Sequence, residues 1–315
     1  MLLSQVTVKA PATTANLGPG FDVFGLALEQ PTDKITLTLI PKGVEIAVSG
    51  LSAATSATVP EKSPAGLVAN HMLKAFSLKA GVKIEVERRI FPSVGLGSSA
   101  ASAAGVAYGL NCMFNLELDN TELIRFAAKG EVASAGVEHA DNVSGAICGD
   151  FVIVKSYNPV EIVNLKSPPD MEVCIAFPHM TIPANKTEKA RSVVPKKVPT
   201  SKLSSNVGKA AALVSGFATD NVDLIGNSMI DVVVEPARAD LVPGYRQVRE
   251  NALRAGACGV AISGAGPAMI AVVNKKKVDA QAVADAMRQG FEVAGFSATA
   301  FATRPGRGAC LMEME

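Results

Sequence analysis

The 315-residue chain contains no tryptophan and only three histidines, and aromatic residues make up 5% of it. Its five cysteines are scattered without CxxC spacing, and no pair of His or Cys residues has the spacing of a transition-metal site. An odd number of cysteines, mostly in apolar runs, predicts reduced thiols and a cytoplasmic protein. The N-terminus lacks a basic region and a cleavage site, so we expect no signal peptide.

The chain also lacks an excess of charge of either sign. Lys and Arg total 30 against 29 for Asp and Glu, and there is neither a basic stripe nor a polybasic tail. This balance argues against a nucleic-acid or membrane-surface partner. The charge-free segment 90–116 is too rich in Gly, Ser and Asn to span a membrane. The length and the 48% hydrophobic content instead predict a globular protein with room for two domains.

The most informative segment is 89–105, where a strand enters a Gly-Leu-Gly-Ser-Ser loop that is followed by an Ala-rich helix. The first N–H groups of a helix have no partner within it, and the helix dipole makes that end electropositive. Gly95 and Gly97 let a ligand approach the backbone, and Ser98 and Ser99 add hydroxyl groups beside it. We interpret the segment as a phosphate-binding loop.

Other patterns compete for this segment. A Gly/Ser turn before a core helix is common in purely structural contexts. Gly95, Gly97 and Ala100 also fit the dinucleotide-binding pattern. The preceding strand, 82–89, alternates apolar and charged residues, however, which is typical of an antiparallel strand with one solvated face. The Walker pattern fails because no Gly-Lys-Ser or Gly-Lys-Thr occurs. The loop is therefore of a third kind.

Polar side chains gather in other segments that are rich in Gly and Pro. Segment 11–22 is predicted to be an ordered loop, in which Asn16 and Asp22 either contact a ligand or bond to turn amides. Segment 136–145 is predicted to be a glycine-bounded turn, where side chains often carry chemistry. Its candidate residues are His139, Asp141 and Asn142.

The second half of the chain offers further candidates. Arg191 and Arg238 are isolated in weakly charged surroundings, and each is either a ligand contact or a solvated surface residue. Residues 259–273 predict two strands joined by a Gly-rich turn, a second place where backbone can meet a ligand. Ligation of Mg²⁺ by carboxylate and hydroxyl oxygens stays open. The elements predict an α+β fold with domains at 1–166 and 167–315, the second with a mostly antiparallel sheet.

Taken together, these segments resemble the GHMP kinases, the superfamily of galactokinase, homoserine kinase and mevalonate kinase. Residues 92–101 resemble its central phosphate-binding motif, and residues 263–268 its third motif. Residues 11–25 are similar to the opening of homoserine kinases in particular, as are residues 139–142 and 235–238. The resemblance spans nearly the whole chain, in order.

This resemblance implies a ribosomal-protein-S5-domain-2-like N-terminal domain, a ferredoxin-like C-terminal domain and an active site between them. It implies phosphorylation of the L-homoserine hydroxyl by ATP with Mg²⁺, giving O-phospho-L-homoserine in threonine biosynthesis. It is compatible with a homodimer.

The resemblance also implies roles for individual residues. The nucleotide would be held by Pro92, Val94, Gly95, Leu96, Gly97, Ser98, Ser99 and Ala100. The metal ligands would be Ser99 and Glu131. The amino-acid site would comprise Asn16, Asp22, His139, Thr187, Arg191, Arg238 and Gly264. The residues nearest the transfer step would be Asn142, Asp141, Glu131 and Arg191.

The chemistry of these residues favours an amino-acid substrate. A carboxylate is bound well by a bidentate donor such as Arg191 or Arg238. An ammonium group needs acceptors, which Asp22 and Asn16 supply. Mevalonate has no ammonium group and a sugar carries no charge, so neither would use all of these groups.

Some alternatives stay open. Either Asp141 acts as a base toward the substrate hydroxyl, or Asn142 faces it and no strong side-chain base exists; we favour the second. The rival functions are a superfamily kinase for another alcohol, a sensor without turnover and a dinucleotide-dependent oxidoreductase. Glu131 and the two loop serines argue against the sensor, because a protein without turnover has no need of metal ligands.

Overall fold

The computed structural model describes residues 3–135, 139–183 and 185–314. Its strands are β1 (Gln5–Asn16), β2 (Gly20–Ile40), β3 (Val44–Gly50), β4 (Gly81–Arg88), β5 (Phe151–Tyr157), β6 (Val160–Leu165), β7 (Met171–Pro178), β8 (Gly259–Ile262), β9 (Met269–Asn274), β10 (Ala298–Thr303) and β11 (Cys310–Met314). Its α-helices are α1 (Pro64–Ala75), α2 (Ser98–Phe114), α3 (Asn120–Ala135), α4 (Asp141–Cys148), α5 (Lys186–Ser192), α6 (Thr200–Ala218), α7 (Val222–Asn227), α8 (Val234–Arg238), α9 (Tyr245–Arg254) and α10 (Ala280–Val293). None of the helices in this described part of the chain is long and apolar enough to cross a membrane.

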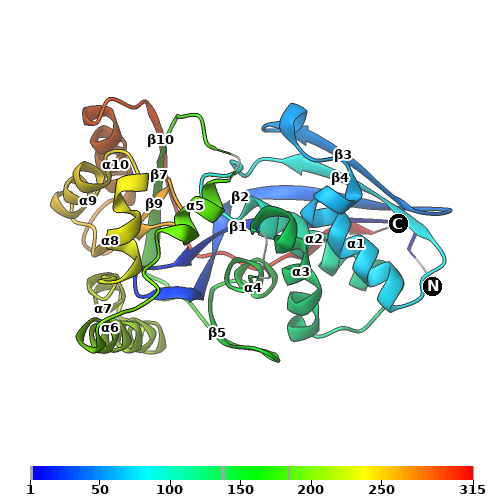
Figure 1. Ribbon diagram of the computed structural model, residues 1–315, viewed down its shortest axis with the longest axis horizontal. Helices are drawn as coiled ribbons and strands as arrows, with labels where there is room; N and C mark the ends of the chain where they lie inside the picture. The colour runs from blue at the N-terminus through cyan, green and yellow to red at the C-terminus, as the bar shows by residue number, and fades with distance from the viewer. Residues whose placement is uncertain (1–2, 136–138, 184, 315) are drawn as a thin grey trace.

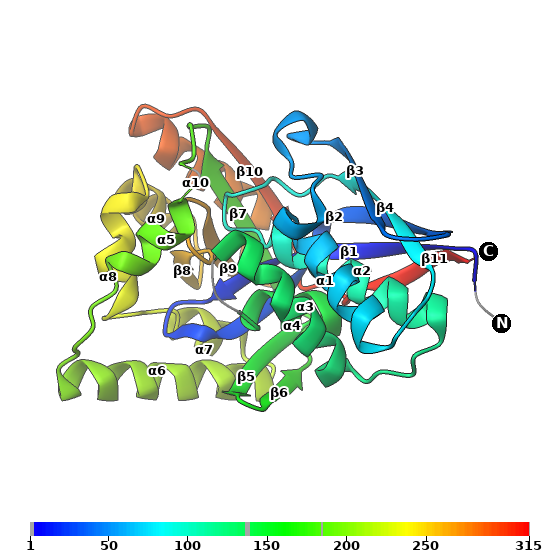
Figure 2. The ribbon, with the colours of Figure 1, turned by 45° about the vertical axis from the view of Figure 1, so that its right-hand side comes forward.

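The N-terminal half is built on a seven-stranded sheet that contains the path β11-β1-β2-β4-β3, with β5 pairing β2 and β6. Helices α1 to α4 gather beside this sheet (Figure 1). Strand β11 pairs antiparallel with β1, so the last strand of the chain returns to the first sheet (Figure 2). The predicted boundary at residues 166 and 167 stays a prediction, but the second domain as predicted would contain a strand of the first sheet.

Strand β4 and helix α2 follow the pattern of their sequence. The apolar residues Val82, Ile84 and Val86 are buried, while the charged residues between them are partly exposed, and β4 runs antiparallel to β2. Helix α2 is buried on most of its circumference, as its uncharged sequence predicts. At Gly105 and Gly109 a Cβ atom would overlap or crowd side chains of β2, so the absence of side chains lets the helix approach the sheet closely.

Two segments predicted to be irregular are regular over most of their described length, and residues 136–138 of the second segment lie outside the described residues. Strand β1 extends to Asn16 and β2 begins at Gly20, so a turn occupies only residues 17–19 of the predicted loop. Likewise Asp141 begins helix α4, and Gly145 lies inside it. In both segments, tertiary pairing and packing outweigh the local preference of Gly and Pro for turns.

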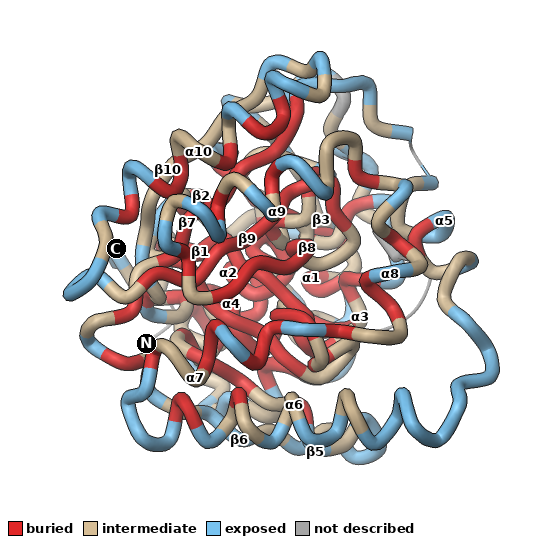
Figure 3. The backbone as a smooth tube through the Cα atoms, turned by 90° about the vertical axis from the view of Figure 1, so that its left-hand side faces the viewer, coloured by how far each residue is buried: buried red, intermediate tan, exposed pale blue. Residues whose placement is uncertain are grey.

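The C-terminal half contains an antiparallel four-stranded sheet of order β10-β7-β9-β8. Strand β7 is buried on both faces. Cys174 and Ala176 belong to a core shared with α9 and α10, whereas Val173, Ile175 and Phe177 belong to the core that continues into the N-terminal half. This explains why the sequence of β7 is apolar except at Glu172. Buried backbone fills the centre of the molecule and the exposed face of α6 lies at its rim (Figure 3).

Aromatic rings connect the two halves. Phe151 of β5 stacks on Phe217 of α6 with ring centroids 3.9 Å apart and an interplanar angle of 3°. Phe24 of β2 meets Phe151 edge-on at 5.1 Å. All three side chains are buried, so α6 is anchored to the N-terminal sheet by this cluster.

We expect Phe217→Ala to destabilise the protein by about 3 kcal/mol, because it removes a buried ring and leaves a cavity between the halves. In a double-mutant cycle with Phe151→Ala, the coupling energy should be about 0.5–1.5 kcal/mol, the value typical of aromatic pairs. Denaturant unfolding measures both. Val207→Ala, on the exposed face of α6, is the control and should change stability by less than about 0.5 kcal/mol. Equal effects of the Phe217 and Val207 variants would contradict the anchoring role.

Candidate active site

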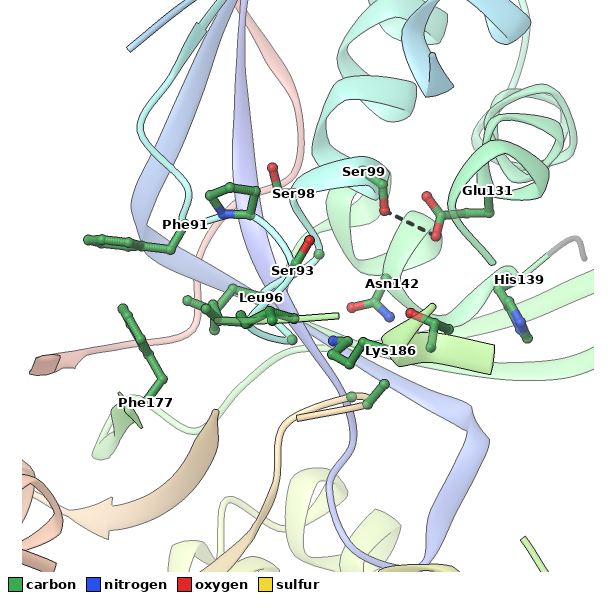
Figure 4. A pocket seen from close by; sticks show the side chains of 18 of the residues that line it. Phe91, Ser93, Leu96, Ser98, Ser99, Glu131, His139, Asn142, Phe177 and Lys186 are labelled. Atoms are coloured by element: carbon green, nitrogen blue, oxygen red, sulfur yellow. Dashed lines mark hydrogen bonds between the residues drawn. The ribbon is translucent and has the colours of Figure 1, made fainter. Parts of the chain in front are cut away.

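A cavity of about 740 Å³ lies where the two halves meet. Residues on both sides of the predicted domain boundary line it, from Asn16 to Ala265. Phe91 and Phe177 stand at one end, with ring centroids 4.8 Å apart, and Glu131 and His139 stand at the other (Figure 4). The cavity therefore has an aromatic end and a polar end.

The Gly-rich loop before α2 is held by its carbonyl groups. The Val94 carbonyl accepts from the Ala268 N–H at 2.8 Å, and the Leu96 carbonyl accepts from the Thr13 N–H at 3.1 Å. Between them, the Gly95 carbonyl lies 2.7 Å from the Ser263 hydroxyl. Three successive carbonyl groups are thus engaged by β1 and by the loop after β8.

Glycine is required where these loops meet. Gly95 has φ +101°, and a Cβ atom there would overlap the Ser263 carbonyl oxygen and lie 3.1 Å from the Gly266 carbonyl oxygen. Gly97 has φ +62°, and a Cβ atom there would overlap the Thr13 hydroxyl. Side chains at these two positions would push apart the segments that form the floor of the cavity.

The N-terminus of α2 faces the cavity. Gly97 is its N-cap, and Ser98 and Ser99 form its first turn and line the cavity. The N–H groups of a first turn have no carbonyl partner within the helix and carry the positive end of its dipole. The Ser99 hydroxyl donates to Glu131 Oε2 at 3.3 Å, which places a buried carboxylate beside this helix end.

Asp33 of β2 fixes the entry of the chain into this loop. Its Oδ1 accepts from the N–H groups of Arg89 and Ile90, both at 2.8 Å. Burial raises the pKa of Asp33 to about 6, and the two backbone hydrogen bonds oppose that rise. The carboxyl group thus caps the backbone where β4 ends.

An ion pair between Asp22 and Arg191 lies at the polar end of the cavity. Both carboxylate oxygens of Asp22 lie 3.0 Å from Arg191 Nη2, which also lies 3.2 Å from Nε2 of His139. Burial and the charge of Arg191 lower the pKa of His139, so its imidazole is neutral at pH 7. The Asp22–Arg191 pair is only half-buried, which leaves both groups accessible to a ligand.

A second arginine lies close by. Arg238 Nε donates to the Ala190 carbonyl at 2.9 Å, and Nη1 donates to the Gly264 carbonyl at 3.1 Å. The same Gly264 carbonyl accepts from Asn16 Nδ2 at 2.9 Å. The guanidinium groups of Arg238 and Arg191 lie 4.9 Å and 5.4 Å from the ring centroid of Phe21. One aromatic ring therefore supports both cations.

Asp141 and Asn142 occupy the start of α4. Asn142 Oδ1 accepts from the Thr13 hydroxyl at 2.9 Å, and Asp141 Oδ1 accepts from the Asn142 N–H at 2.8 Å. Asp141 is 5% exposed, and burial raises its pKa to about 6. A carboxyl group in this setting is held in place by the helix start, and its ionisation is disfavoured relative to water.

Two stretches of the chain match family models, residues 64–150 that for the GHMP kinases N terminal domain and residues 210–293 that for the GHMP kinases C terminal domain. The chain belongs to the GHMP kinase family.

The relatives of this kinase include two archaeal proteins named homoserine kinase. The Methanocella arvoryzae protein is 43% identical over 306 residues, covering 97% of each chain. The Methanococcus vannielii protein is 41% identical over 278 residues, covering 88% of this chain and 90% of its own. The crystal structure of homoserine kinase from Cytophaga hutchinsonii superposes with a TM-score of 0.91 at 34% identity, covering 98% of each chain. The kinase groups with these proteins, and the predicted α+β fold of this family is confirmed.

The structure brings the predicted site residues together. Apart from Ala100, every predicted residue lines the one cavity, from the loop 92–99 through Glu131 and 139–142 to Thr187, Arg191, Arg238 and Gly264. Ala100 is fully buried and could contribute only its backbone N–H. The roles assigned to these residues stay predictions.

Several residues of the cavity region were not predicted, among them Thr13, Phe21 and Lys186. Thr13 connects the phosphate loop to Asn142, and Phe21 supports the two arginines. Lys186 at the start of α5 lines the cavity. Thr13 and Phe21 lie within the resemblance at 11–25, which could have revealed them. Nothing in the sequence distinguishes Lys186 from Lys189 in the same helix.

The oxygen atoms at the helix end suit Mg²⁺. The described residues contain no cluster of three or more His, Cys, Asp or Glu side chains able to hold a metal. Magnesium usually takes one or two protein carboxylates and completes its shell with phosphate oxygens and water. Glu131 and the Ser99 hydroxyl, 3.3 Å apart, match that requirement.

We expect Gly95→Ala to lower the affinity for ATP by at least about tenfold, because a hydrogen bond to a charged group contributes about 1.5–3 kcal/mol and the displaced loop would lose such bonds. Isothermal titration calorimetry measures this affinity.

Gly43→Ala is a matched control for this variant. Gly43 also has a positive φ, of +84°, but a Cβ atom there would meet nothing within 4 Å. Its backbone strain should lower stability without changing ATP affinity. If the two variants bound ATP equally well, close approach of the loops would not be what shapes the nucleotide site.

Proposed function

We propose that this protein is a homoserine kinase that transfers the γ-phosphoryl group of ATP to the hydroxyl of L-homoserine. The observation that carries the proposal is the Asp22–Arg191 pair, beside Arg238, in the same cavity as the phosphate loop. The names of the relatives support the same substrate. The product, O-phospho-L-homoserine, would belong to threonine biosynthesis.

The polar end of the cavity complements the backbone of an amino acid. A ligand carboxylate can replace Asp22 as the partner of Arg191, with Arg238 adjacent, and a ligand ammonium can take Asp22 as its partner. The substrate would thus exchange one ion pair for two. Neutral His139 and the nearby Thr187 can accept or donate hydrogen bonds without adding charge.

The nucleotide would lie along the rest of the cavity, with its base toward the aromatic end at Phe91 and its phosphates on the N-terminus of α2. Phosphoryl transfer needs positioning and charge neutralisation more than covalent help from the protein. The N–H groups of Ser98, Ser99 and Ala100 would supply fixed donors for the phosphate oxygens. Mg²⁺ held by Glu131 and Ser99 would add positive charge at the phosphates.

In the transfer step, the substrate hydroxyl oxygen bonds to the γ-phosphorus as the bond to the β,γ-bridging oxygen breaks, and ADP leaves. We infer that the hydroxyl proton passes to an oxygen of the transferred phosphoryl group. Asn142 supports this inference because its Oδ1 accepts from Thr13. Its Nδ2 donates to Asp141 Oδ1 at 3.5 Å, which leaves one amide hydrogen for the substrate. Asp141 is nearly inaccessible and bonds to the start of its own helix. No strong side-chain base is then required.

The substrate assignment predicts that both charges of the amino acid are required. We expect 4-hydroxybutyrate, which lacks the ammonium group, and 3-aminopropan-1-ol, which lacks the carboxylate, to have kcat/KM values about 100-fold or more below that of L-homoserine. ADP release with MgATP measures each rate. Mevalonate should give no turnover.

Asp22→Asn should reduce the difference in kcat/KM between L-homoserine and 4-hydroxybutyrate, because the partner of the ammonium group is lost. Glu188→Gln removes a carboxylate from the exposed surface of α5 and should leave both rates unchanged. Turnover with mevalonate alone would refute the amino-acid site, and ATP binding without any turnover would favour a sensor.

Asp141→Asn separates the two interpretations of the transfer step. We expect kcat to fall by less than about tenfold, whereas loss of a general base costs about 100-fold or more. A fall of that size in a folded variant would make Asp141 the base.

The same variant should change the pH dependence of stability. The pKa of Asp141 is raised from 3.8 to about 6 on folding, so ionisation of this carboxyl group destabilises the folded protein. The destabilisation develops as the pH rises from about 3.8 and reaches its full size above about pH 6. The stability of Asp141→Asn relative to the wild type should therefore increase by about 2 kcal/mol between pH 4 and pH 7. A difference that does not vary with pH would show that Asp141 has an ordinary pKa.

A further inference from the structure

The phosphate loop brings no cation of its own. Residues 90–116, which include the whole loop and the helix after it, carry no charged side chain. The donors that the loop offers the cavity are backbone N–H groups and the hydroxyls of Ser93, Ser98 and Ser99. A triphosphate carries several negative charges, so positive charge has to come from elsewhere in the cavity.

The cations that line the cavity come from other elements. Among the described residues, the Arg and Lys side chains that line it are Arg88, Lys186, Arg191 and Arg238. Arg88 Nη1 donates to the Ser56 hydroxyl at 2.6 Å, away from the polar end. Arg191 is paired with Asp22, and Arg238 binds the carbonyls of Ala190 and Gly264.

Lys186 reaches the loops that enclose the phosphate site. Its Nζ donates to the Gly266 carbonyl at 2.6 Å. That carbonyl oxygen is the one that would lie 3.1 Å from a Cβ atom on Gly95. The Gly266 carbonyl thus lies between the ammonium group of Lys186 and the backbone of the phosphate loop. Lys186 lines the same cavity as Asn142 (Figure 4).

One carbonyl acceptor leaves the ammonium group incompletely bonded. An ammonium group has three N–H donors, and the Gly266 carbonyl takes one of them. In the described structure, no salt bridge joins Lys186 to a carboxylate. A half-buried lysine with donors to spare at the edge of a phosphate cradle is suited to bind a phosphoryl oxygen.

We propose that Lys186 contacts the γ-phosphoryl group of the bound nucleotide and neutralises its charge during transfer. Lys186 belongs to the half of the protein opposite the loop, so a nucleotide would be held between the N-terminus of α2 and the start of α5. This deepens the proposed kinase function and rests on it for the reaction, but the nucleotide contact can be tested without the second substrate.

Three substitutions separate the charge of Lys186 from its hydrogen bond to Gly266. Lys186→Met removes both, Lys186→Gln keeps a donor without the charge, and Lys186→Arg keeps the charge. We expect kcat/KM for MgATP to fall by about 10- to 100-fold in the first two and to be largely kept in the third. Lys189→Met, exposed on the same helix, is the control and should match the wild type. Wild-type activity in Lys186→Gln would show that Lys186 only connects α5 to the loop after β8 through its hydrogen bond to Gly266, and would overturn the proposal.

Binding of nucleotides locates the contact. Lys186→Met should lose affinity for the non-hydrolysable triphosphate AMP-PNP about tenfold or more while binding ADP like the wild type, because only the triphosphate has a γ-phosphoryl group. Calorimetry without homoserine measures both. Equal losses for the two nucleotides, or no loss, would contradict the proposal. If the wild type fails to phosphorylate homoserine but shows this difference, the substrate assignment fails and the contact of Lys186 stands.

The pH profile gives a readout that a structural tether would not change. Burial and the charge of Arg238 lower the pKa of Lys186 to about 8, so its charge is present at pH 7 and lost as pH rises through 8 in the free enzyme. The other charged or titratable groups that share the polar end are Asp22, Glu131, His139, Asp141 and Arg191. We expect kcat/KM for MgATP to decline above about pH 8 in the wild type and to be maintained in Lys186→Arg, since arginine stays charged. Coincident profiles would overturn the proposal.

Discussion

The structure depends on the contact of the phosphate loop with strand β1 and with the loop after β8. The carbonyls of Val94, Gly95 and Leu96 are engaged by the loop after β8 and by β1, so the phosphate loop is held from both halves at once. Its carbonyls are directed toward these partners, which leaves the helix end of α2 open to the cavity. Backbones can approach this closely only where there is no Cβ atom, and Gly95 meets that condition. The same contact that joins the halves therefore shapes the phosphate site.

The charged side chains at the polar end of the cavity form an ion pair that a ligand can break at little cost in free energy. Asp22 and Arg191 pair with each other, at side-chain exposures of 29% and 39%. A pair this exposed contributes only about 0–1 kcal/mol, so a zwitterionic ligand can replace it at small cost. The ligand then gains two ion pairs in a cavity from which it has displaced water. The buried Asp141 differs, because it accepts a hydrogen bond from the Asn142 N–H at the start of its own helix.

The end of the cavity at the phosphate loop differs from the polar end in how its polar groups are arranged. The loop there is neutral, and its donors are N–H groups fixed by the fold, so their direction needs no reorganisation when a phosphate binds. In the proposed function, positive charge would come from side chains of the opposite half, among them Lys186. A site made in this way is complete only when both halves are in contact. The aromatic stack of Phe151 on Phe217 and the glycine loops maintain that contact.

The amino-acid sequence by itself determined the glycine-rich turn before α2, the buried helix α2 and the half-solvated strand β4. Glycine freedom, an uncharged run and period-two alternation are local properties, and neighbours along the chain suffice to express them. Local composition was misleading in parts of 11–22 and 136–145, where strand pairing takes residues 11–16 into β1 and helix packing takes residues 141–145 into α4. Only the tertiary structure decided which polar groups meet. Asp22 and Arg191 are 169 residues apart in the chain, and Lys186 faces the cavity while Lys189 of the same helix faces solvent. The orientation of a short helix is set by packing against distant segments, and such long-range packing has no signature in a local stretch of sequence.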